Sequence, residues 1–299
     1  MTFSPFPEED RLRRFTLSRG RRPGHNEDAS GEERSSRGLL TALADGLGGH
    51  AGGEIASRLA VETALAAWRR CEAAPDATDR EDAECPGSPG HGSLWVGHTL
   101  ERCLQEAHEA LLHRAREEGL PPLLTTLALL WIGANGVMGW CSLGDTRVHL
   151  FRGGALEART RDHSLVQALV ESGRVPLRDA RRHPERNVLT AALGDPNAKN
   201  LSPEIFCGEA KRGDALLLCT DGFWEWLAEV EMLADLLATE DPAAWIFRME
   251  LRLYGHLLRE TERNGQKGKL LDDYSAVAVL VGADTAANDT DDRRDDPWD

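Results

Sequence analysis

Apolar and polar positions in the first third of the chain indicate a buried strand followed by two long helices. The apolar run at residues 38–44 predicts the strand, and apolar residues over 54–70 recur at helical spacing. A second helical pattern covers residues 94–118. It ends before Pro121 and Pro122, because proline cannot continue a helix.

The period changes at Thr125, where three strand patterns follow in close succession. They read TTLALLWI, GVMGWCSL and RVHLFRGG, and the segments Ala134-Asn135-Gly136 and Leu143-Gly144-Asp145-Thr146 that separate them are typical of turns. The other expected elements are strands over residues 11–18, 214–219 and 275–281 and helices over residues 164–172, 224–238 and 242–262.

Composition divides the chain into one folded domain, residues 11–283, and two polar ends. Residues 1–10 are expected to be a flexible N-terminus, and residues 284–299, which hold seven aspartates, an acidic disordered tail. Residues 71–93 are rich in Ala, Pro, Gly, Asp and Glu and predict a mobile surface loop within the domain.

The overall charge excludes one class of partner. The net charge of −15 and the pI of about 5.2 argue against a nucleic-acid binder that relies on phosphate contacts. The six cysteines form no CxxC pair and the N-terminus has no signal-peptide pattern, so a reduced, cytoplasmic setting is expected. No apolar run is long enough to span a membrane. The chain is therefore expected to be a soluble protein without nucleic-acid or membrane partners.

Acidic residues stand at the ends of several predicted strands, mostly beside glycine. They are Glu27, Asp28, Asp45, Asp145, Asp221, Glu225 and Asp272. Each one alone is as well explained by a turn or a helix cap. Together they would repel one another in one pocket, and hard divalent ions such as Mg²⁺ or Mn²⁺ prefer such oxygen ligands. The sequence therefore predicts a site for these ions where the strand ends meet.

Five motifs in order resemble the metal-dependent protein phosphatases (type 2C), specifically the bacterial branch of that family. They are NEDA at Asn26, ADGLGGHAGGEIAS at Ala44, SLGDTRVHLFRGG at Ser142, LLLCTDGFWE at Leu216 and DDYSAVAVLV at Asp272. A sixth segment, residues 161–192, resembles the family's flap. The resemblance implies an α+β fold, a four-layer α-β-β-α sandwich of two antiparallel sheets flanked by helices, with a dinuclear metal site at one edge.

The resemblance also implies a role for each acid. Asp45 matches the ligand that bridges two Mn²⁺ or Mg²⁺ ions, with the Gly46 carbonyl beside it. Glu27 matches a ligand of one ion, and Asp221 and Asp272 match ligands of the other. The remaining roles are support of the metal-bound waters for Asp28 and binding of a weaker third ion for Asp145, with Asp221 and Glu225.

Three positions depart from the family pattern. The family's phosphate-binding arginine falls at Pro23, so Arg22 is assigned that role, with Arg21 as the alternative. Leu47 replaces a histidine that eukaryotic members carry, so water or another group must protonate the leaving alkoxide. Asp273 replaces an asparagine, and it could instead be the direct ligand in place of Asp272.

The function implied is a protein serine/threonine phosphatase that uses a metal-activated water. Its expected partners are phosphorylated proteins, among them a bacterial Ser/Thr kinase and the substrates of that kinase, and the chain is expected to be monomeric. Two alternatives remain open at this point. The chain could be a catalytically weak regulatory or binding module with the phosphatase fold, or a two-metal phosphohydrolase of small phosphate esters.

Overall fold

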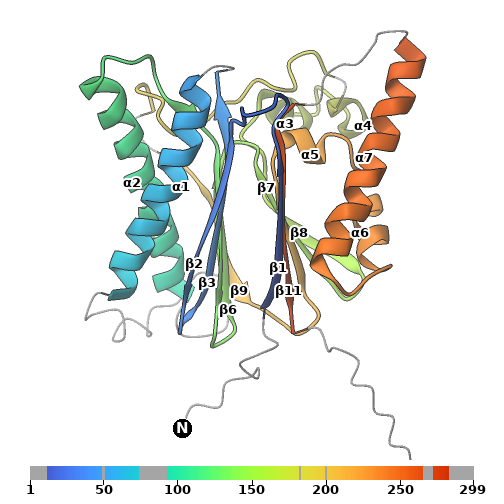
Figure 1. Ribbon diagram of the computed structural model, residues 1–299, viewed down its shortest axis with the longest axis horizontal. Helices are drawn as coiled ribbons and strands as arrows, with labels where there is room; N and C mark the ends of the chain where they lie inside the picture. The colour runs from blue at the N-terminus through green and yellow to red at the C-terminus, as the bar shows by residue number, and fades with distance from the viewer. Residues whose placement is uncertain are drawn as a thin grey trace, which may run out of the picture.

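The computed structural model describes residues 12–48, 51–73, 93–181, 183–198, 201–264 and 272–282. Two β-sheets face each other, and helices cover the outer face of each sheet (Figure 1). The predicted flexible N-terminus (1–10), the acidic tail (284–299) and residues 74–92 of the predicted loop lie outside the described residues.

The first sheet is antiparallel and has the strand order β2-β3-β5-β6-β9, with the short strand β4 paired to β3. Its strands are β2 (Asp28–Ser35), β3 (Gly38–Leu47), β4 (Leu124–Thr125), β5 (Leu127–Gly133), β6 (Val137–Leu143) and β9 (Glu204–Glu209). Helices α1 (Ala51–Ala73) and α2 (Ser93–Glu117) pack side by side on its outer face (Figure 1). Gly31 of β2 lets α1 approach, because a Cβ there would lie 2.8 Å from the Leu65 side chain.

The second sheet is also antiparallel, with the order β1-β11-β10-β7-β8. Its strands are β1 (Leu12–Arg19), β7 (Arg147–Arg152), β8 (Ala155–Arg159), β10 (Ala215–Cys219) and β11 (Tyr274–Val281). Helices α6 (Glu229–Leu236) and α7 (Pro242–Asn264) cover its outer face (Figure 1). The short helices α3 (Leu165–Glu171), α4 (Leu177–Ala180) and α5 (Asp221–Trp224) gather at one end of the sandwich (Figure 1).

Three separate apolar layers hold the four structural layers together. One lies between α1, α2 and the first sheet and contains Trp68. The second fills the space between the two sheets around Trp140, and the third lies between the second sheet and helices α5 to α7 around Trp245. This arrangement confirms the predicted four-layer α-β-β-α sandwich. Because the central strands are covered on both faces, β5 and β11 are buried along their whole length.

Several element predictions were wrong in detail. The sequence prediction omitted β2, β8 and β9, which are strands at sheet edges with many charged or exposed positions. The helix predicted over 224–238 begins only at Glu229, because α5 ends at Trp224 and Ala228 is extended, its N–H donating to the Glu231 carboxylate at 2.8 Å. The loop predicted over 71–93 begins later, since α1 continues to Ala73.

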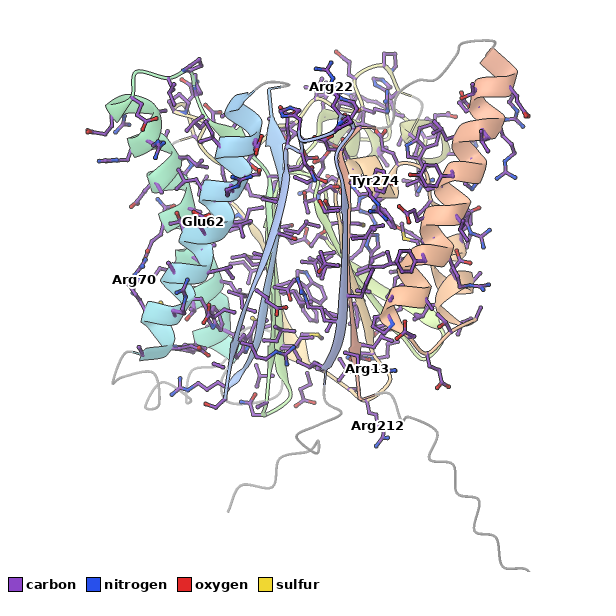
Figure 2. The ribbon with its side chains drawn as sticks, viewed as in Figure 1. Arg13, Arg22, Glu62, Arg70, Arg212 and Tyr274 are labelled. Carbon is purple, nitrogen blue, oxygen red and sulfur yellow. The ribbon has the colours of Figure 1, made fainter. Side chains whose placement is uncertain are left out.

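The predicted site residues lie near one end of the sandwich. Figure 2 shows Arg22 and Tyr274 near one end and Arg13 and Arg212 at the other. Strand β3 ends, and β11 and α5 begin, at the end that holds Arg22. In the part of the chain that the structure describes, no helix combines the length and apolar character needed to cross a membrane. All five cysteines among the described residues are free thiols.

Candidate metal centre

Asp28 and Asp45 are brought together by the pairing of β2 with β3. The register of these strands places Asp28 directly opposite Asp45. The Gly46 N–H donates to the Glu27 carbonyl at 3.0 Å, which continues the pairing one step beyond β2. Glu27, Asp28 and Asp45 thus share one sheet end with the Gly46 carbonyl.

Two threonines fix the main chain of Asp45. The Asp45 N–H donates to the Thr126 hydroxyl at 2.9 Å. The Asp45 carbonyl accepts from the Thr126 N–H at 2.9 Å and from the Thr125 hydroxyl at 2.7 Å. With both main-chain groups of Asp45 occupied, its backbone is held rigidly and the direction of its side chain is set.

Asp221 comes from the second sheet, as the first residue of α5 directly after β10. Burial and the charges of Asp28 and Asp221 raise the pKa of Asp45, so the Asp221 carboxylate lies close to that of Asp45. The preceding residue, Thr220, donates its hydroxyl to Asp28 Oδ2 at 2.9 Å. The two sheets therefore contribute carboxyl groups to the same place, and a cation bound between Asp45 and Asp221 would offset their charges.

Asp145 lies in the turn between β6 and β7 and is buried. Its carbonyl accepts the indole N–H of Trp224 at 3.0 Å, so α5 holds this turn in place. Gly144 has a φ of 103°, and a Cβ there would lie 2.5 Å from Thr126. A glycine is required at position 144 for the turn to pack against Thr126, which lies between β4 and β5.

Burial and mutual repulsion raise the pKa of every acid at the centre of this cluster. Desolvation is the largest cause in each case. It raises the pKa of Asp28 to about 8 and that of Asp221 to about 6, with contributions from neighbouring carboxylates. The pKa values of Asp45 and Asp145 are raised well above the usual range by burial and by the Asp221 charge. Divalent cations bound among these carboxylates would offset the cost of burying their charges.

Glu27 depends on two glycines for its position. Its side chain is buried, and a Cβ on Gly53 of α1 would lie 3.0 Å from both Cδ and Oε1 of Glu27. A Cβ on Gly46 would lie 2.1 Å from the Gly53 carbonyl oxygen. Among the described residues, neither Oε1 of Glu27 nor Oδ1 of Asp28 has a hydrogen-bond partner, although both atoms are buried. Orphaned carboxylate oxygens in a fixed position are suited to a cation.

Asp272 and Asp273 have different environments. Asp272 is 57% exposed and lies 3.4 Å from the Arg21 guanidinium. Asp273 is buried, and its carboxylate accepts the N–H groups of Glu27, at 2.7 Å, and of Arg21. The Asp273 carboxylate therefore anchors the loop that carries Glu27, which leaves Asp272 as the freer of the two for a metal ion.

Arg22 and Glu225 are placed at the border of the site. Arg22 is exposed in a tight turn in which its carbonyl accepts the His25 N–H at 3.1 Å, and among the described residues it forms no ion pair. Glu225 follows α5 and forms an ion pair with Arg186 of the predicted flap at 2.9 Å.

The donor chemistry of the cluster fits hard divalent ions. Its groups are carboxylates and one carbonyl. Within the described residues, no three His, Cys, Asp or Glu side chains converge closely enough to hold an ion as they stand.

A family model, "Protein phosphatase 2C", matches residues 18–255. The chain belongs to the protein phosphatase 2C family. It is 32% identical over 220 residues to the serine/threonine phosphatase stp of Listeria innocua, across 73% of this chain and 80% of that protein.

Solved structures of family members have the same architecture. The Mycobacterium tuberculosis phosphatase PstP/Ppp is 27% identical, with a TM-score of 0.68 over 91% of this chain and 100% of that one. The catalytic domain of PstP in complex with two manganese ions is 29% identical, with a TM-score of 0.66 over 91% of this chain and 99% of that one. These matches confirm the predicted family and fold.

The sequence interpretation missed one candidate functional residue, His25. His25 lies 3.7 Å from Glu27 and 3.5 Å from Glu54, so it links the metal-site loop to α1. Its position two residues before Glu27 was the only sequence signal. Thr125 and Thr126 have a structural role, because both bond to the main chain of Asp45.

Proposed function

We propose that the chain is a metal-dependent protein phosphatase that hydrolyses phosphoserine and phosphothreonine in proteins. The observation that carries the proposal is the convergence of acids from two sheets: Asp28 lies opposite Asp45 in the first sheet, and Thr220, which precedes Asp221 at the end of a strand of the second sheet, donates to Asp28 at 2.9 Å. Two bound Mn²⁺ or Mg²⁺ ions would supply a water of lowered pKa as the nucleophile and offset charge on the phosphoryl oxygens.

Each acid of the cluster would have its own role in binding the ions. Asp45 would bridge the two ions with the Gly46 carbonyl beside it, Glu27 would complete one ion's set, and Asp221 and Asp272 the other's. Asp28 is held by Thr220 at 2.9 Å and would accept hydrogen bonds from metal-bound waters. Because Glu225 is paired with Arg186, a third, weaker ion would depend on Asp145 and Asp221.

Arg22 would bind the substrate phosphate. Its guanidinium is exposed and without an ion pair among the described residues, whereas Arg21 is engaged with Asp272. A free guanidinium can form two parallel hydrogen bonds to a phosphate. Leu47 offers no proton to the leaving alkoxide, so that proton would come from water.

The decisive experiment measures hydrolysis of a phosphothreonine peptide with Mn²⁺ and with EDTA. We expect activity only with the metal, and we expect Asp45→Asn to lower kcat/KM by several orders of magnitude. Rates near wild type in Asp45→Asn would remove the metal assignment. Absence of Mn²⁺ binding in titration calorimetry would favour a regulatory module, and faster turnover of nucleotides than of phosphopeptides would favour a small-ester hydrolase.

The physiological setting is proposed from the same chemistry. Substrates would be phosphorylated proteins, including a Ser/Thr kinase and the proteins it modifies, and the enzyme would act as a monomer in the cytoplasm. The phosphatase domain would span residues 11–283, with residues 161–192 as its flap. A comparison of phosphoproteins in cells with the active enzyme and with Asp45→Asn would identify the targets.

A further inference from the structure

A cavity of about 370 Å³ lies beside the acid cluster, between the segment that carries α3 and α4 and the helices α5 and α6. Trp224 separates it from the metal centre. The indole N–H of Trp224 donates to the Asp145 carbonyl, while the Arg147 guanidinium carbon lies 3.3 Å from the centre of its ring. Both Trp224 and Arg147 line the cavity, so it shares a wall with the candidate metal centre.

The cavity is positively charged in a chain whose net charge is −15. Five arginines line it, against three carboxylates, Asp162, Glu225 and Glu229. Asp162 binds Arg147 through both oxygens, at 2.8 and 2.6 Å, and Arg159 pairs with Glu229 at 2.9 Å. Since Arg186 pairs with Glu225, all three carboxylates are already neutralised, and the positive charges of the two remaining arginines are left over.

Arg181 and Arg178 are those two. Nη2 of Arg181 donates to the main-chain carbonyls of Trp224 and Leu227, and no carboxylate among the described residues pairs with it. A guanidinium carries five N–H donors, so most of those on Arg181 remain for an occupant of the cavity. The nearest carboxylate to Arg178 is that of Asp179, at 3.9 Å, and Arg178 is 84% exposed.

Apolar side chains form the rim of the same cavity. Leu177 of α4 is 69% exposed and Val230 of α6 is 74% exposed, although both line the cavity. Val166 and Val170 of α3 add further aliphatic surface. A ligand that contacts both the arginines and the apolar rim therefore has an anionic group next to an apolar group. A phosphorylated or acidic stretch of polypeptide has both.

We propose that this cavity is a second anion subsite, which binds a second phosphate on the same substrate protein. The proposal rests on the function proposed above, because the first phosphate would occupy the metal centre. Asp221 belongs to the metal centre, and Glu225, which follows α5 four residues later, lines the cavity, a rise of about 6 Å. Since an extended peptide advances about 3.3 Å per residue, this rise corresponds to about two positions, and the two phosphoresidues would be at least that far apart.

The test compares two phosphothreonine peptides that differ only in a second phosphoserine three positions away. With Mn²⁺ we expect kcat/KM for the first dephosphorylation to be about tenfold or more higher for the doubly phosphorylated peptide, the usual size of an Arg–phosphate contact. Arg181→Gln should reduce this ratio to nearly one, and Arg181→Lys should restore part of it. Arg102→Ala, on the exposed face of α2, should leave the ratio unchanged.

Circular dichroism and thermal unfolding would establish that each variant folds. Arg178→Ala gives a second measurement in a side chain too exposed to affect folding, and it should lower the ratio by a smaller factor. Equal kcat/KM for both peptides in the wild-type enzyme, or a ratio that survives both substitutions, would overturn the subsite alone. Failure of the wild-type enzyme to hydrolyse either peptide with Mn²⁺ would overturn the proposed function as well.

Discussion

Replacing Asp221 with asparagine should stabilise the metal-free protein although it removes the activity. Burial, the Glu225 charge and the Asp272 charge raise the pKa of Asp221 from 3.8 to about 6. A raised carboxyl pKa means that the fold disfavours the ionised form. The part of the unfolding free energy that depends on the protonated Asp221 carboxyl group is therefore fully present below about pH 4 and is lost as the pH rises through 6.

The structure sets the size of this effect. A difference of about two pKa units corresponds to about 3 kcal/mol of unfolding free energy at pH 7.5. Asp221 is partly exposed to solvent and coupled to Asp45, which reduces the expected gain to about 1–3 kcal/mol. Asparagine keeps a hydrogen-bonding side chain beside Asp45 but cannot ionise, so it avoids this cost.

Urea denaturation in EDTA at pH 4.5 and at pH 7.5 would measure the effect. The variant should exceed the wild-type protein in unfolding free energy at pH 7.5, and its advantage should be only about a third as large at pH 4.5. Asp179→Asn, a substitution of a side chain that is 60% exposed, is the matched control and should have little effect at either pH. Added Mn²⁺ should stabilise the wild-type protein more than Asp221→Asn, because ligands of the native state stabilise it by mass action.

The reasoning would be refuted by either of two results. One is a variant less stable than the wild-type protein in EDTA at pH 7.5, which would mean that Asp221 contributes favourable contacts in the absence of metal. The other is equal stabilisation of both proteins by Mn²⁺, which would exclude Asp221 as a ligand.

Three other substitutions test separate parts of the site and fold. Gly53→Ala should weaken Mn²⁺ binding in titration calorimetry because its Cβ would press on Glu27 at 3.0 Å, whereas Gly52→Ala, whose Cβ would meet only Leu123 at 3.9 Å, should not. Arg22→Ala should raise KM for a phosphopeptide about tenfold with little change in kcat; a KM equal to that of wild type would exclude it as the phosphate ligand. Burial lowers the pKa of His149 to about 3, so the stability that depends on its neutral ring is lost as the pH falls below about 6.5. In His149→Phe, the unfolding free energy measured by urea denaturation should therefore depend less on pH between pH 6.5 and 4.

Central strands and long helices were predictable because their patterns are strong and local. The buried strands β3, β5 and β11 are nearly continuous apolar runs, and α1, α2 and α7 have a helical apolar period. Edge strands were not predictable in this way. Strand β2 reads DASGEERS, and its strand conformation depends on pairing with β3 and on the contact of Gly31 with α1.

The acids of the candidate site were found for a related reason. Each stands at a strand end or a tight turn, and glycine beside an acid is visible in the sequence. The supporting contacts were not visible. His25 reaches Glu54 on α1, and Asp273 binds the main chain of Glu27 across 246 positions, so both depend on tertiary structure.

The substitution of asparagine by Asp273 now has a physical explanation. An asparagine side chain has one acceptor oxygen, and its NH₂ group donates and cannot accept from a main-chain N–H. The Asp273 carboxylate instead accepts the N–H groups of both Arg21 and Glu27, one on each oxygen. Burial is the largest cause that raises the pKa values of Glu27 and Asp28, and the Asp273 charge raises both further. It also increases the field that attracts a cation. Asp273 therefore couples the position of the Glu27 loop to the charge of the metal centre.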